Sequence, residues 1–172
     1  MLRSLAAGIA YHCIPYIQLI RLIFLLPDPL LPFAQNQLYS QNIFDFMEPY
    51  AVPQENGNRT DVRWMFLSNK NSEGLLVIAD SLLSMSAWPY TEENIEDSKH
   101  TIDLKDAGYI TLNIDLSQMG VGGNDSWSEV AAPLPKYQIP AGSYRYGFYL
   151  IPYKKGKQRL SDFVKKSTEG NH

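Results

Sequence analysis

The stretch "YITLNIDL", residues 109–116, decides the fold class of this chain. Apolar residues occupy every second position of the stretch, and most of the residues between them are polar. Successive side chains of a β-strand point to opposite faces of the sheet, so this alternation predicts a strand with one buried face. The buried face is expected to consist of Ile110, Leu112, Ile114 and Leu116, with Thr111, Asn113 and Asp115 on the other side.

Three other stretches, "DVRWMFLS" (61–68), "GLLVIADS" (74–81) and "SYRYGFYL" (143–150), also have the character of strands. The second is a short continuous apolar run, which is typical of a strand buried on both faces. Turn-forming clusters such as "QENGN" and "NKNSEG" separate the stretches. The pattern predicts an all-β fold, an antiparallel β-sandwich. The predicted strand faces are Val62, Trp64 and Phe66 in the first stretch, and Tyr144, Tyr146, Phe148 and Leu150 in the last.

One short helix is expected within "TEENIEDSKH", residues 91–100. Thr91 is a favourable N-cap residue, because its hydroxyl can accept a hydrogen bond from a free backbone N–H. The acidic residues that follow are favourable in the first turn of a helix.

Composition narrows the classes of function. The 172 residues predict a single domain, and the net charge of −3 gives no reason to expect a nucleic-acid partner. Cys13 is the only cysteine, so neither a disulfide nor a cysteine metal cluster is expected. Aromatic residues make up 12% of the chain, and eleven of them are tyrosines. Such residues suit strands, interfaces and sugar-facing surfaces, because each joins an apolar face to a polar group.

The chain divides into three regions: residues 1–38, 39–153 and 154–172. The first is rich in leucine and proline, and its prolines and Arg21 argue against a membrane-spanning helix, so no membrane partner is expected. It is either a weak anchor or leader, or a poorly ordered segment that does not belong to the fold. The last is a basic tail with Leu160, Phe163 and Val164 at helical spacing, either solvated or a surface-binding helix.

No catalytic residue and no metal ligand set stands out. His100 is the only histidine inside the expected fold, and a structural role next to the short helix suits it best. Glycoside hydrolysis requires two carboxylates that face each other across the scissile bond. Glu55 and Asp125 sit in turns, where carboxylates commonly accept hydrogen bonds from the backbone, and no pair is distinguished by the sequence.

Four separated motifs nevertheless resemble the C-terminal domain of family 2 β-galactosidases. They are "PYAVPQENGNRTDVRW" (49–64), "WPYTEENIEDSKHTIDL" (88–104), "MGVGGNDSW" (119–127) and "IPAGSYRYGFYLIP" (139–152). The resemblance covers residues 39–153 and implies part of a galactose-mutarotase-like supersandwich whose first strands are missing. In the family, the catalytic glutamates and the magnesium and sodium sites lie on other domains. The resemblance therefore implies no catalytic residue and no cofactor in this chain.

The resemblance also implies a role for Trp127, which follows a glycine-rich turn. In the family this tryptophan reaches the active site and stacks on the second sugar, the glucose of lactose. Asn124 and Asp125 are expected to support the loop by hydrogen bonds from side chain to backbone. Trp64 and Trp88 are expected to be core residues, since one lies on a strand face and the other precedes a proline.

Three functions follow as hypotheses. The first is a fragment of a β-galactosidase, an enzyme that hydrolyses terminal β-D-galactosides such as lactose. The fragment would contribute the acceptor-sugar-binding loop without catalysis of its own, and its partner would be the rest of a β-galactosidase chain or oligomer. The alternative is a stand-alone carbohydrate-binding β-sandwich module. A mutarotase-like enzyme is the third hypothesis, and it is disfavoured because His100 is the only available histidine base.

Overall fold

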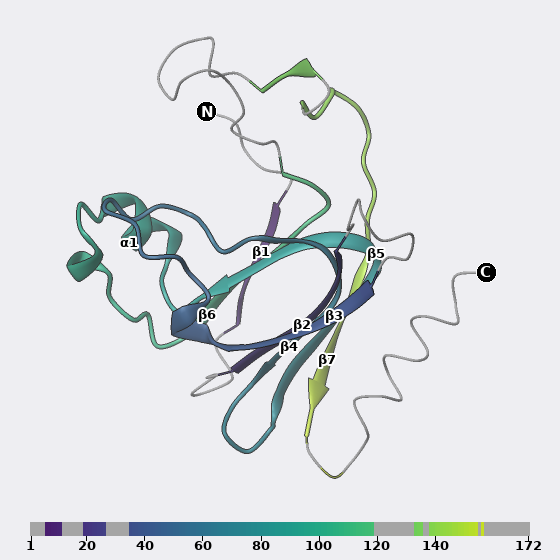
Figure 1. Ribbon diagram of the computed structural model, residues 1–172, viewed down its shortest axis with the longest axis horizontal. Coiled ribbons are helices and arrows are strands. Elements are labelled where there is room, and N and C mark those ends of the chain that lie inside the picture. Colours follow the sequence, from purple (N-terminus) through teal and green to yellow (C-terminus); the bar gives the residue numbers. More distant parts are fainter. Residues whose placement is uncertain are drawn as a thin grey trace.

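The computed structural model describes residues 6–11, 19–26, 35–118, 133–135, 138–154 and 156, with side chains from residue 39 onward. Its strands form a seven-stranded sheet in which every pairing is antiparallel (Figure 1). The strands are β1 (Ala6–Tyr11), β2 (Leu19–Leu26), β3 (Gln35–Asn42), β4 (Arg59–Ser68), β5 (Gly74–Trp88), β6 (Ile110–Asp115) and β7 (Phe148–Tyr153). The helical elements of the described residues are η1 (Ile43–Asp45), α1 (Glu92–Asp97) and η2 (Thr101–Asp103). The predicted all-β class is confirmed.

Strand β5 is the centre of the sheet. The strand order is β1-β6-β5-β4-β2-β3, and β7 also pairs with β5. The first part of β5, Gly74–Ala79, pairs with β7, and its last part, Ser84–Trp88, pairs with β6. Residues 80–82 between these two parts are exposed. One fifteen-residue strand therefore serves two different neighbours along the same edge.

The core lies on both faces of β4 and β5. One cluster joins residues of β4, β5 and β6, with residues of β7 packed against it, and it includes Ile110, Leu112 and Ile114, which are buried as the alternation predicted. Trp64, Phe66, Leu76 and Ile78 form a second cluster. The run 74–81 predicted a strand buried on both faces, and its apolar residues 75–78 confirm this by alternating between the two clusters.

The face predicted for Val62 is wrong. Val62 was expected beside Trp64 and Phe66, but it packs in the first cluster and the other two pack in the second. The cause is an irregularity in the ladder: Val62 pairs with Leu83, whereas Trp64 pairs with Ile78. Against β2 the same step is irregular: Ile23 pairs with Trp64 and Phe24 with Val62, so β4 has one extra residue, Arg63, between them. Such a bulge changes the face on which the following side chains of its strand lie.

The other side of β6 is also buried. Asn113 is 4% exposed and Asp115 is 1% exposed, although both were expected on the polar side of the strand. Strand β6 lies between β1 and β5, and Asn113 Nδ2 donates to the Ser86 hydroxyl at 3.4 Å. Asn113 and Asp115 therefore face protein rather than solvent.

The structure places parts of the N-terminal region in the sheet. Strand β1 pairs with β6, and β2 pairs with both β3 and β4. This differs from the expectation that residues 1–38 lie outside the fold. Strands β4 and β6 would otherwise present unpaired backbone groups at these edges, and the apolar runs between the prolines are long enough to pair with them.

The predicted helix and the last predicted strand are present with shifted limits. The Thr91 hydroxyl accepts a hydrogen bond from the Asn94 backbone N–H at 2.9 Å, as expected of the cap of α1. Tyr146, Phe148 and Leu150 pack against the first core cluster, but the strand begins only at Phe148, and Tyr144 is exposed.

No helix in the described part of the chain is long and apolar enough to cross a membrane.

Candidate functional site

The predicted site residues Trp127, Asn124 and Asp125 lie outside the described residues. The structure describes the residues that precede this segment, as far as Gln118. The Gln118 side-chain amide donates to Asp115 Oδ2 at 2.9 Å and to Glu55 Oε1 at 3.3 Å. These three residues, called the loop anchor below, join the end of β6 to the turn that precedes β4.

The loop anchor concentrates negative charge. Burial raises the pKa of Asp115 above its usual value, the hydrogen bond from Gln118 lowers it in part, and the charge of Glu92 raises it further. Burial also raises the pKa of Glu55, followed by the charge of Asp115. The two hydrogen bonds from the Gln118 amide therefore offset part of the repulsion between two carboxylates that the fold holds close together.

Sequence reasoning missed the loop anchor. Glu55 was interpreted as a turn residue that accepts backbone hydrogen bonds, and Asp115 as one of the alternating polar residues of a strand. Glu55 and Gln118 are 63 positions apart, so only the pairing of strands brings them together. No local pattern in the sequence indicates the contact.

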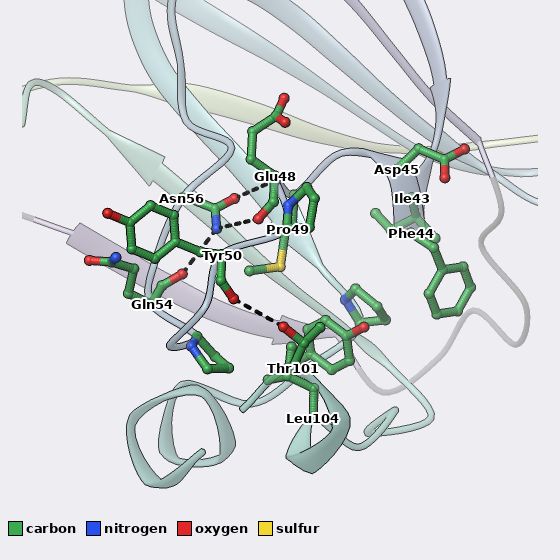
Figure 2. Close-up of a pocket in the computed structure, with 14 residues that line it drawn as sticks. Ile43, Phe44, Asp45, Glu48, Pro49, Tyr50, Gln54, Asn56, Thr101 and Leu104 are labelled. Carbon is green, nitrogen blue, oxygen red and sulfur yellow. Dashed lines mark hydrogen bonds between the residues drawn. The ribbon is translucent and has the colours of Figure 1, made fainter. Parts of the chain in front are cut away.

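A pocket lies next to the loop anchor, between residues 43–56 and residues 89–104, with a volume of about 360 Å³ (Figure 2). Its lining is mainly apolar and includes prolines, Met47, Tyr90 and Leu104. Phe44 and Tyr50 also line it, and they are 52% and 59% exposed. The described part of the chain thus presents an open apolar hollow with aromatic residues at its edge.

The backbone around the pocket is braced by two side chains. Asn56 Oδ1 accepts from the Glu48 N–H at 2.9 Å, and Asn56 Nδ2 donates to the carbonyls of Glu48 and Gln54 at 3.2 Å each. The Thr101 hydroxyl donates to the Tyr50 carbonyl at 3.0 Å, which ties the loop to η2 (Figure 2). The shape of the pocket is therefore fixed by bonds internal to this chain.

Gly57 is required at the end of this turn. Its φ is +76°, a conformation that residues with a Cβ rarely adopt. An added Cβ would lie 2.8 Å from the Phe46 carbonyl oxygen. The Arg59 guanidinium lies over the Phe46 ring, 4.7 Å from its centre, and covers the same corner. The "ENG" of the first family-like motif thus places Glu55 in the loop anchor, Asn56 in the brace and Gly57 in the turn.

The remaining candidates have structural positions. Trp64 and Trp88 are 4% and 1% exposed, so their predicted core role is confirmed. His100 is exposed, and its backbone N–H donates to Asp103 Oδ2 at 2.9 Å at the start of η2. Within the described ranges, no group of three or more histidine, cysteine, aspartate or glutamate residues could hold a metal ion.

Comparison with known proteins identifies the class of this domain. The family described as beta galactosidase small chain matches residues 34–150, which include the loop anchor, the pocket loop and Trp127. The chain is 35% identical to a β-galactosidase of Priestia megaterium over 120 residues, 69% of this chain and 11% of that protein. It is 34% identical to the β-galactosidase BgaC of Bifidobacterium adolescentis over 111 residues, 63% of this chain and 10% of that protein.

A β-galactosidase of Streptococcus thermophilus is 31% identical over 125 residues, 71% of this chain and 12% of that protein. The fold and these matches define an all-β domain of glycoside-cleaving enzymes. The chain belongs to the β-galactosidase small-chain family, as its four motifs predicted. It spans about a tenth of the length of the relatives that it matches.

Proposed function

We propose that this chain forms the acceptor-sugar side of a β-galactosidase active site. In this proposal Trp127 stacks on the sugar that leaves or accepts galactose, such as the glucose of lactose. The catalytic carboxylates are supplied by the rest of the enzyme. The observation that carries the proposal is the loop anchor: the segment with Trp127 starts directly after Gln118, whose amide is bonded to both Asp115 and Glu55.

The physical argument is that the start of the segment with Trp127 is held in a defined position. A stacking contact is useful only if the ring is held at a fixed distance from the reacting bond. Asp115 is almost fully buried at the end of β6, and Glu55 belongs to a turn braced by Asn56. The chain therefore enters the loop from a point defined by two separate elements. An aromatic face there suits the apolar C–H face of a sugar, and Asn124 and Asp125 would support the loop by backbone hydrogen bonds.

The proposal gives the isolated chain no hydrolytic activity. Hydrolysis of a glycosidic bond requires a pair of carboxylates on opposite sides of that bond. The chain matches only about a tenth of each relative, and we propose that the remainder of such an enzyme is its partner. A stand-alone carbohydrate-binding module remains the alternative, and it would bind sugar without that partner.

The test is Trp127→Leu in an enzyme that carries this domain. We expect the affinity for glucose as acceptor to fall by about tenfold, the value of one aromatic contact. Hydrolysis of a galactoside with a small leaving group should change little, because that substrate leaves the acceptor position empty. Equal loss for every substrate, together with a lower melting temperature, would identify Trp127 as a core residue instead.

A further inference from the structure

The pocket beside the loop anchor is lined by residues within 43–56 and 89–104, none of which belongs to the predicted site residues Trp127, Asn124 and Asp125. Phe44 and Tyr50 line it with 52% and 59% of their surfaces exposed. Single exposed apolar residues are ordinary, but two exposed aromatic side chains that line the same hollow are typical of a surface that another molecule covers.

The pocket is already formed without a partner. Asn56 and Thr101 satisfy the backbone of the loop by themselves, through the bonds to Glu48, Gln54 and Tyr50. Preformed hollows at the centre of an interface commonly accept one anchor side chain from the partner, and such anchors contribute most of the binding energy. The volume of about 360 Å³ is sufficient for a large apolar side chain.

The charges at the edge of the pocket indicate which residues flank the docked side chain of the partner. Asp45 and Glu48 both line the pocket and are exposed, and no described lysine or arginine forms a salt bridge with either. Tyr90 also lines the pocket, and its phenol is a hydrogen-bond donor: burial, followed by the charge of Asp106, raises its pKa still further above neutral pH. A complementary segment would therefore carry an apolar side chain flanked by lysine or arginine, with an acceptor for the Tyr90 hydroxyl.

The position of the pocket identifies the partner. Gln54 and Asn56 line the pocket, and Glu55 between them is bonded to Gln118, the residue directly before the loop with Trp127. If that loop reaches an active site on the rest of a β-galactosidase, the adjoining pocket faces the same partner. The relatives are about ten times longer than the matched region, so such a partner has ample chain to cover it.

We propose that the pocket lined by Phe44, Tyr50 and Tyr90 is the docking site for an apolar side chain, flanked by basic residues, from the remainder of a β-galactosidase. This inference rests on the proposed function only in its choice of partner. It assigns to the pocket the task of holding the domain against the catalytic part of the enzyme, whereas the contact with the sugar itself belongs to Trp127.

The experiment uses the full 172-residue chain, co-expressed with the Priestia megaterium β-galactosidase from which the matching 120 residues have been removed. The dissociation constant of the complex and the hydrolysis of a chromogenic galactoside are both measured. Tyr50→Asp should weaken association by about tenfold or more, as expected for an anchor pocket that gains a charge. Phe44→Asp should act in the same direction, because Phe44 also lines the pocket. Both side chains are exposed, so the melting temperature of the isolated chain should not change.

The matched control is Tyr149→Asp, because Tyr149 is 60% exposed but lies on β7, outside the pocket. Association of the wild-type chain, lost in the two pocket variants and kept in the control, supports the docking site. No association of the wild-type chain, or equal affinity in all variants, overturns it.

The same complex separates this inference from the proposed function. Trp127→Leu should leave association unchanged and impair only transfer to glucose. If Tyr50→Asp abolishes association while Trp127→Leu has no effect on transfer, the docking site stands and the acceptor role fails. If association is insensitive to Tyr50 while Trp127 governs transfer, the acceptor role stands and the docking site fails.

Discussion

Replacing Gln118 by alanine should destabilise the fold by about 2 kcal/mol at neutral pH, because it removes hydrogen bonding from a buried charge. Asp115 is 1% exposed, its Oδ1 has no hydrogen-bond partner, and its Oδ2 accepts from Gln118 at 2.9 Å. Without that amide, no hydrogen bond to this carboxylate remains among the described residues. Leaving a buried polar group unsatisfied costs about 1–3 kcal/mol, and a charged group lies toward the upper end.

The loss should depend on pH, with a sign that follows from the pKa of Asp115. Burial raises this pKa in the folded chain above its unfolded value. Protonation therefore favours the folded state, and this contribution is fully present below the unfolded pKa and disappears as the pH rises through the folded pKa. The hydrogen bond from Gln118 stabilises the ionised form, so its removal raises the pKa further. The variant should be most destabilised at neutral pH and approach the wild type as the pH falls.

The measurement is urea denaturation of the full chain, followed by circular dichroism at neutral and at mildly acidic pH. Gln138→Ala is the matched control, because the amide of this exposed residue donates to the Pro133 carbonyl at 2.8 Å and touches no carboxylate. A loss for Gln118→Ala that equals the control, or that is the same at both pH values, would refute the assigned role of Asp115.

Three further results are expected. Gly57→Ala should cost about 1–3 kcal/mol, because φ is +76° and the Phe46 carbonyl is close, whereas Gly142→Ala, which has neither constraint, should cost little in the same denaturation assay. Trypsin should cleave slowly at Arg21, since β2 is paired on both sides, and rapid first cleavage there would show that the segment lies outside the fold. The purified chain should not hydrolyse a chromogenic galactoside, and turnover that depends on one of its own carboxylates would contradict this.

The parts of the fold that could be predicted are those with a local signal. Alternation identified the core face of β6, and the continuous apolar run identified a part of β5 that is buried on both sides. The cap at Thr91 was predicted because its hydroxyl bonds a residue only three positions away. In each case the interaction that stabilises the element lies within a few residues or repeats with the period of the strand.

The parts of the fold that could not be predicted depend on which strands pair and in which register. The face of Val62 follows from its position opposite Leu83 rather than from the pattern in its own strand. The pairing of β1 with β6 joins segments about a hundred positions apart, and alternation says nothing about which strand will be the neighbour. The predicted role of Trp127 stays a prediction, because it rests on the resemblance and lies outside the described residues.

The turn at residues 53–57 connects the two proposed roles of this domain. Gln54 and Asn56 line the pocket, whereas Glu55 is bonded to Gln118, which directly precedes the segment with Trp127 that we propose as the acceptor loop. Since Asn56 bonds the backbone of Glu48 and Gln54, the pocket and the loop anchor share one braced turn. A partner seated in the pocket would therefore define the starting point of the acceptor loop. Docking of the domain and positioning of its sugar contact would then be one structural event rather than two.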